Sequence, residues 1–149
     1  MTTIGIDPGK NGGIAWITNG KPCVEKMPET IKDLWDLLDS IRWSTIGNGK
    51  CGDPCTAFIE AVHSSSQMGV TSAFTFGQGF GRLEMAIQGI GFRMERVSPQ
   101  KWQKAMGCLT KGDKNVSKRR AQELFPSMKV THATADALLI CEYGRRISQ

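Results

Sequence analysis

The sequence predicts a single α/β domain over residues 1–149, in which a mixed five-stranded sheet carries helices on both faces. Three short apolar segments joined by tight turns open the chain, which predicts an antiparallel meander. Two further apolar strands follow, each after a segment with helical periodicity, which is typical of parallel crossovers. A chain of 149 residues, 40% of them hydrophobic, is long enough to bury one core.

The opening meander consists of three predicted strands. Thr2–Asp7 is apolar and β-branched, and the turn cluster Asp7–Gly13 follows it. Ile14–Thr18 is the second strand, and the hairpin signal Asn19-Gly20 leads into the third, Lys21–Met27.

Helices and strands alternate in the middle of the chain. Pro28–Ile41 has apolar residues at three- and four-residue spacing, which predicts an amphipathic helix. Thr56–Val62 is continuously apolar, as in a central strand. Gly69–Gly89 is predicted to be a long helix, and Gly91–Val97 is the fifth strand.

Small residues recur every four positions along that long helix, at Gly69, Ala73, Gly77 and Gly81. Each interior glycine costs about 1 kcal/mol relative to alanine. We therefore expect a sheet or a second helix to approach this ridge closely. A dinucleotide-binding interpretation is poor, because the glycines lie inside the helix and not in a loop before it.

Three helices are predicted in the last third of the chain: Ser98–Met106 with Pro99 at its first position, the basic segment Val116–Leu124, and Thr131–Ile147. The complete order of three strands and then alternating helices and strands is that of the ribonuclease-H-like architecture.

The net charge of +5 is concentrated in one segment. Residues 93–129 contain ten Lys or Arg and three Asp or Glu, whereas residues 1–60 contain six and eight. A clustered basic surface is typical of nucleic-acid binding, and a solvated helix face is the alternative.

Localisation is predicted to be cytoplasmic, in the host cell if the protein is viral. No apolar run reaches the roughly 18 residues that a membrane span needs, and no basic and apolar leader precedes the first strand. The five cysteines argue against a disulfide framework. Cys51 and Cys55 with His63 make a poor zinc pattern, because the spacing is unusual and a fourth ligand is missing.

Three acidic residues, Asp7, Glu60 and Asp136, interrupt apolar segments that resemble core elements. A carboxylate in such a segment is costly unless a cation or a donor compensates it. Three together indicate a site that holds divalent metal through oxygen ligands. The structural alternatives are a turn cap for Asp7, an ion-pair partner for Glu60, and a helix-start residue favoured by the helix dipole for Asp136.

Several short motifs occur in a characteristic order: Ile4–Gly9 with Gly12-Gly13, Phe58–His63, Ser72-Ala73 with Gly77-Gln78 and Gly81, Val97–Pro99 with Trp102, Lys114, Ala121, Phe125-Pro126, and Ala135–Ile140. Together they resemble the RuvC-type Holliday junction resolvases, in particular small phage-like members. The resemblance implies a homodimer that binds a four-way DNA junction. It also implies an endodeoxyribonuclease of DNA recombination and repair that uses Mg²⁺, or Mn²⁺ in its place, and leaves 5′-phosphate and 3′-hydroxyl ends.

The family pattern has a fourth acid three residues before its last Asp, where this chain has Ala133. His132 lies four residues before Asp136 and therefore on the same helix face. It is open to three interpretations: a metal ligand, a general acid or base, or an exposed residue. We count it with Asp7, Glu60 and Asp136 as a candidate catalytic residue.

Further residues are candidates for DNA contact. His63 occupies a position where the resemblance implies a ring that stacks on an unpaired base, and a loop histidine is the alternative. The candidates for phosphate contact are basic: Lys101, Lys104, Lys111, Lys114, Lys118 and Arg119.

Other functions remain as alternatives to a junction resolvase. One is a nuclease that debranches flaps and forks as well, and another is a protein that binds branched DNA without cutting it. An actin-like phosphotransferase is disfavoured, because that fold needs two such halves, so no nucleotide cofactor is expected.

Overall fold

The computed structural model describes residues 1–46, 54–63, 66–110 and 112–148. Its strands are β1 (Thr2–Asp7), β2 (Gly13–Thr18), β3 (Lys21–Lys26), β4 (Cys55–Glu60) and β5 (Arg93–Val97). Its helices are α1 (Ile31–Thr45), α2 (Val70–Gly89), α3 (Pro99–Met106), α4 (Lys114–Leu124) and α5 (His132–Ile147).

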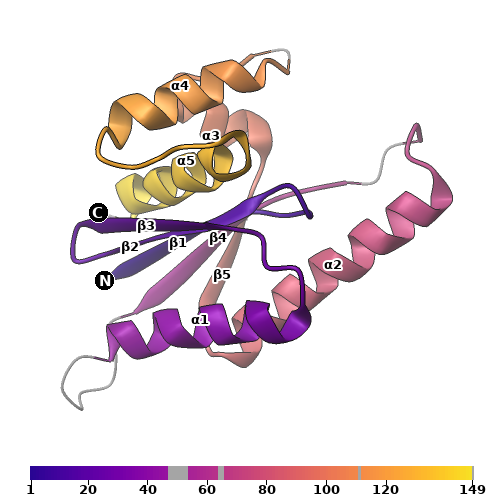
Figure 1. Cartoon of the computed structure of the whole chain (residues 1–149), viewed down its shortest axis with the longest axis horizontal. Coiled ribbons are helices and arrows are strands. Elements are labelled where there is room, and N and C mark those ends of the chain that lie inside the picture. Colours follow the sequence, from indigo (N-terminus) through magenta and orange to yellow (C-terminus); the bar gives the residue numbers. More distant parts are fainter. Residues whose placement is uncertain (47–53, 64–65, 111, 149) are drawn as a thin grey trace.

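The strands form one mixed five-stranded sheet in the order β3-β2-β1-β4-β5. β1, β2 and β3 pair antiparallel, and β4 and β5 continue the sheet in parallel with β1. α1 and α2 cover one face, and α3, α4 and α5 cover the other (Figure 1). The predicted fold class is therefore confirmed.

Capping side chains move two helix starts away from the predicted positions. α1 begins at Ile31 and not at Pro28, because the Thr30 hydroxyl caps it and accepts a hydrogen bond from the Asp33 backbone N–H at 3.1 Å. α4 begins two residues earlier than predicted, because the Asp113 carboxylate accepts from the Asn115 backbone N–H at 2.9 Å.

The face under α1 and α2 is a mainly aliphatic layer. Ile4 and Ile6 of β1 and Ile59 of β4 point into it, since alternate residues of a strand share a face. They meet Leu38 of α1 and Ile87 of α2, and all five side chains are 0% exposed.

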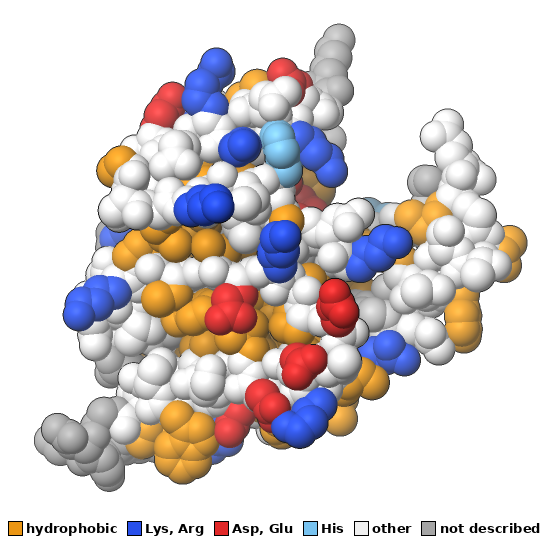
Figure 2. Space-filling model, in the orientation of Figure 1, with side chains coloured by type: hydrophobic (Ala, Val, Ile, Leu, Met, Phe, Trp, Pro, Cys, Tyr) orange, Lys and Arg blue, Asp and Glu red, His pale blue; other side chains and the backbone are white. Residues whose placement is uncertain are grey.

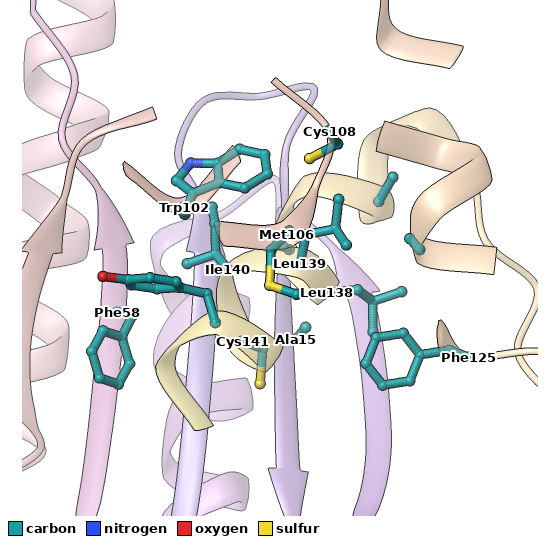
Figure 3. Packing of buried hydrophobic residues seen from close by; sticks show 14 of the residues in the cluster. Ala15, Phe58, Trp102, Met106, Cys108, Phe125, Leu138, Leu139, Ile140 and Cys141 are labelled. Carbon is teal, nitrogen blue, oxygen red and sulfur yellow. The ribbon is translucent and has the colours of Figure 1, made fainter. Parts of the chain in front are cut away.

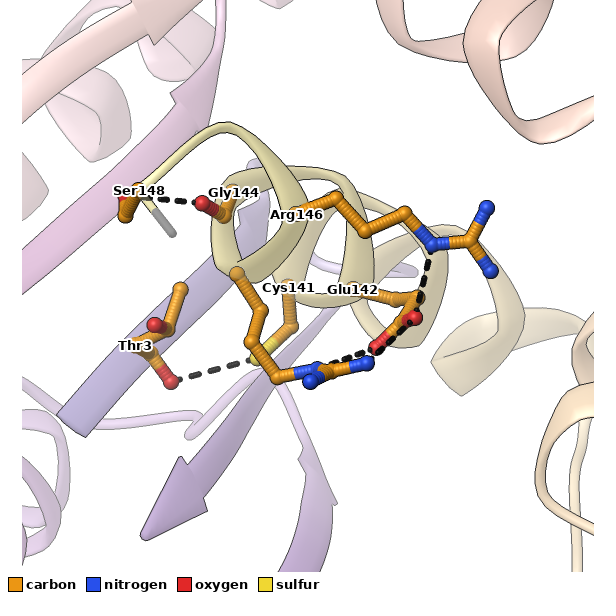
Figure 4. Close-up of polar contacts among 7 residues, drawn as sticks. Thr3, Cys141, Glu142, Gly144, Arg146 and Ser148 are labelled. Atoms are coloured by element: carbon orange, nitrogen blue, oxygen red, sulfur yellow. Dashed lines mark hydrogen bonds and ion pairs between the residues drawn. The ribbon is translucent and has the colours of Figure 1, made fainter. Parts of the chain in front are cut away.

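The opposite face lies in very close contact with α5. A Cβ added to Gly5 of β1 would lie 2.2 Å from the Cys141 nitrogen, and one added to Gly144 would lie 2.2 Å from the Phe58 ring. The Cys141 thiol donates to the Thr3 carbonyl at 3.1 Å (Figure 4). Glycine is required at these positions because any side chain would push α5 off the sheet.

Aromatic and sulfur-containing side chains complete the core on this side. Trp102 and Met106 of α3 pack with Leu139 of α5, and all three are almost wholly buried (Figure 3). α3 is thereby fixed to α5, and the start of α3 lies next to the end of β5.

The small-residue ridge of α2 differs from its prediction. A Cβ added to Gly69, Gly77 or Gly81 would meet nothing within 4 Å among the residues that the structure describes. Ala73 is half-buried. The expected close neighbour is therefore absent within the described part of this chain.

The two edge strands of the sheet are polar. β3 has Pro22 between exposed Lys21 and Cys23, followed by exposed Glu25 and Lys26. On β5, Arg93 pairs with Glu95 at 3.0 Å. Among the described helices, none combines the length and the apolar character that crossing a membrane requires.

Candidate active site

Asp7 and Glu60 lie side by side at the carboxyl ends of β1 and β4. These strands are parallel, with Ile6 opposite Ile59, so the next residues on each strand are also opposite one another. Because Ile6 and Ile59 face α1 and α2, Asp7 and Glu60 face the α5 side. Both acids are half-buried.

Asp136 comes to the same edge from α5. Thr131 caps this helix, and Thr131 and Thr134 exchange hydrogen bonds between their side chains and backbone N–H groups. The first turn of α5 lies on β2, where a Cβ on Gly13 would be 2.8 Å from the Ala133 carbonyl oxygen. Asp136 follows in the second turn, half-buried against the sheet.

The three carboxylates influence one another electrostatically. Burial, and after it the charges of Glu60 and Asp136, raise the pKa of Asp7 to about 7. Burial and the charge of Asp136 raise the pKa of Glu60. Burial also raises the pKa of Asp136. Burial and neighbouring negative charges both oppose ionisation of a carboxylate. The raised pKa values therefore mean that the protein supplies too little positive charge to neutralise these acids.

Few groups compensate these carboxylates. Lys114, the first residue of α4, lowers the pKa values of both Asp7 and Asp136. The Ser117 hydroxyl lowers the pKa of Asp136 by hydrogen bonding, although Asp136 Oδ1 is buried without a hydrogen-bond partner in the described structure.

The donor set fits a hard divalent cation in its chemistry. It offers carboxylate oxygens, one of them buried and unpartnered, at a place where negative charge is in excess. In the arrangement of the described side chains, no group of three or more His, Cys, Asp or Glu residues is positioned to hold a metal ion. A cation here would need the acid side chains to change their arrangement.

Trp102 is a site residue to which sequence reasoning assigned no role. Its indole Nε1–H donates to Glu60 Oε1 at 3.0 Å, and its side chain is 0% exposed. Ser117 was missed as well. A tryptophan on the buried face of a helix does carry a signal, since its N–H needs an acceptor, but the sequence does not identify that acceptor.

The two candidate histidines belong to different segments of the chain. His132 is the first residue of α5 and is exposed, and its charge lowers the pKa of Asp136, so it lies near that acid. His63 is exposed and follows the end of β4 by three residues.

Most predicted phosphate contacts are on α3 and α4. Lys101, Lys104, Lys114 and Arg119 are exposed, and Lys118 is half-buried; Lys111 lies outside the described residues. The neighbouring Arg120 has a structural role, because its Nε donates to the Met106 carbonyl at 2.8 Å. In the face shown by Figure 2, basic side chains gather over α4 and α5, and acidic ones gather over β3 and α1.

Comparisons with known proteins place this geometry in a known fold. No family model and no curated protein sequence matches the chain. The solved structure of Thermus thermophilus RuvC is similar, with a TM-score of 0.61 and 18% identity, over 99% of this chain and 97% of that chain. T. thermophilus RuvC in complex with a Holliday junction substrate is similar as well, with a TM-score of 0.60 and 18% identity, over 99% of this chain and 96% of that chain. The RuvC fold therefore extends over nearly the whole chain.

Proposed function

We propose that this protein is a metal-dependent, structure-selective DNA endonuclease that resolves four-way junctions by paired nicks, leaving 5′-phosphate and 3′-hydroxyl ends. The observation that carries the proposal is the meeting of Asp7, Glu60 and Asp136 at one sheet edge. T. thermophilus RuvC, which has the same fold, has been solved in complex with a Holliday junction substrate. This supports branched DNA as the ligand.

Asp7, Glu60 and Asp136 would hold Mg²⁺ or Mn²⁺, and His132, which acts electrostatically on Asp136, would assist. When bound, divalent ions would relieve the charge of the scissile phosphate and favour attack by water. The carboxylates also have a role of their own, because an anionic site at the sheet edge repels phosphate until cations neutralise it.

Basic side chains beside the acids would position the DNA. Lys114 acts electrostatically on both Asp7 and Asp136. Its ammonium group would bind a backbone phosphate next to the cut. Lys101, Lys104 and Arg119 would extend this contact along α3 and α4 without reading sequence.

We also propose that the protein acts as a homodimer, since symmetric nicks need two active sites. The exposed face of α2 is a candidate interface. Val70, Phe74 and Met85 are 88%, 66% and 67% exposed. They share a helix face with Gly77 and Gly81, whose surroundings are open. An apolar face with small residues is suited to a second copy of the same helix.

The test is cleavage of a labelled, immobile four-way junction with Mg²⁺ or Mn²⁺. Linear duplex and a flap serve as comparison substrates, and Asp7→Asn serves as the inactive control. Paired symmetric nicks by the wild type alone would support the proposal. Equal cutting of flaps and forks would replace it with a general debranching nuclease. Tight junction binding without cleavage in either metal would replace it with a binding protein.

A further inference from the structure

Trp102 is completely buried, and its single polar atom faces an acid of the candidate site. The indole Nε1–H donates to Glu60 Oε1 at 3.0 Å, across 42 residues of sequence. An indole nitrogen is only a donor and never an acceptor. The contact therefore favours a Glu60 rotamer that points an unprotonated carboxylate oxygen toward the indole.

α3 holds this indole firmly. The helix begins with Pro99 and ends at Gly107, which has φ 71 in the left-handed region. Arg120 of α4 donates to the Met106 carbonyl at 2.8 Å and so ties the last turn of α3 to α4. Trp102 and Met106 are 0% and 1% exposed in the core with α5. The donor is therefore fixed by packing on several sides.

Glu60 has no comparable support from its own strand. It is the last residue of β4, and the Ala61 N–H that follows is bonded to the Val97 carbonyl of β5 at 2.7 Å. A glutamate side chain has three rotatable torsions, and the backbone fixes none of them. The hydrogen bond from Trp102 engages one carboxylate oxygen and thereby orients the other.

We propose that Trp102 is a positioning residue that orients the Glu60 carboxylate as an oxygen ligand for the divalent ion. The inference rests on the proposed function, because it presupposes that Glu60 binds the ion. Hydrogen bonds to ligating carboxylates commonly change metal affinity by roughly 10- to 100-fold when they are removed.

The variant Trp102→Phe removes the N–H and keeps an aromatic ring. Trp43→Phe is a matched control, since the Trp43 indole donates to the Asp39 carboxylate at 3.1 Å on exposed α1. Calorimetry with Mn²⁺ and no DNA measures the affinity. We expect the Mn²⁺ dissociation constant to rise about tenfold for Trp102→Phe and to stay unchanged for Trp43→Phe.

Junction cleavage separates positioning from loss of structure. If Trp102 positions Glu60, Trp102→Phe should need about tenfold more Mg²⁺ for half-maximal cleavage, with most of the maximal rate recovered at saturating Mg²⁺. A lower thermal midpoint with an unchanged Mn²⁺ dissociation constant would show a purely structural role and overturn the proposal.

Should Trp102→Phe fail to fold, the wild type still decides the question. In a Mg²⁺ titration of ¹⁵N-labelled protein, we expect the indole signal of Trp102 to shift at the Mg²⁺ concentration that saturates the site. The Trp43 signal should not move. An unmoved Trp102 signal in a protein that binds Mg²⁺ would overturn the positioning role alone. A wild type that binds neither Mn²⁺ nor Mg²⁺ would overturn the proposed function and this inference with it.

Discussion

Gly5 on β1 and Gly77 on α2 are both glycines inside regular elements, but their surroundings are opposite. A Cβ on Gly5 would lie 2.2 Å from the Cys141 backbone nitrogen, whereas one on Gly77 would meet nothing within 4 Å. The first glycine lets α5 lie directly on the sheet and bring Asp136 to the acids of β1 and β4. The second leaves a face of α2 open. Glycine thus serves internal packing on one side of the sheet and leaves the helix surface open on the other.

The largest effect is expected for Gly5→Ala. The added methyl group would collide with the backbone of α5, which cannot rotate away as a side chain can. We expect the free energy of unfolding to fall by about 3 kcal/mol or more, at the upper end of overpacking effects. Urea denaturation measures it. A loss below about 1 kcal/mol would show that α5 can move off β1 at little cost, and the contrast between the two glycines would fail.

The acids on the α5 side of the sheet should make the free energy of unfolding depend on pH. The pKa of Asp7 is raised from 3.8 to about 7, so between these pH values the folded protein holds a proton that the unfolded chain has released. Stability without divalent ions should therefore fall as the pH rises from about 4 to 7, by at most about 1.4 kcal/mol per pH unit.

Asp7→Asn removes this carboxylate and should flatten that slope. We expect the variant to be more stable than the wild type by about 2 kcal/mol at pH 8 without metal. Chemical denaturation from pH 4 to 8 checks it. Mg²⁺ should stabilise the wild type and leave the variant unchanged, whereas parallel pH profiles would refute the clustering of the acids.

A smaller effect, with two opposite readouts, is expected for Gly77→Ala on the open side. In dilute, monomeric protein the alanine should increase the free energy of unfolding by about 1 kcal/mol through helix propensity. If a second copy covers α2, the same methyl group should weaken self-association in sedimentation velocity. Higher stability with unchanged association would exclude this ridge as the interface.

The smallest effect is expected for the salt dependence of DNA binding, when single lysines are removed from the two faces of the molecule. Lys104 on α3 is exposed beside the acid-bearing face, whereas Lys32 on α1 is exposed on the opposite one. Lys104→Ala should reduce the slope of log affinity for a four-way junction against log salt by about 1, and Lys32→Ala should not. Fluorescence anisotropy in Ca²⁺ at several salt concentrations measures both slopes. Equal slopes would remove α3 from the DNA face.

Local patterns in the sequence were sufficient to predict the order of the elements. Alternating and helical periodicities are local, and so are the Asn19-Gly20 and Pro99 signals, so the order of the helices and strands in the described residues follows from them. The three acids could be identified as site candidates because carboxylates are rare in apolar segments. Small errors arose at helix starts, where the capping residues Thr30 and Asp113 determine the boundary.

The contacts that support the site side chains could not be predicted from the sequence. The bond between Trp102 and Glu60 depends on how α3 packs over β4, which no pattern within either segment records. The ridge on α2 was predicted to pack closely, since its spacing is that of a packed helix. The spacing does not reveal whether the neighbour belongs to the same chain, and in the described structure the ridge is open.

The polar edge strands have a consequence for how copies of this protein can join. Pro22 removes an N–H from β3, and charges on Lys21 and Lys26 flank it, while Arg93 and Glu95 line β5. Such edges discourage another strand from adding to the sheet, which protects the chain against amyloid-like aggregation. If copies of this protein associate, we expect them to do so through helices, and a crowded solution of the folded protein should stay free of fibrils.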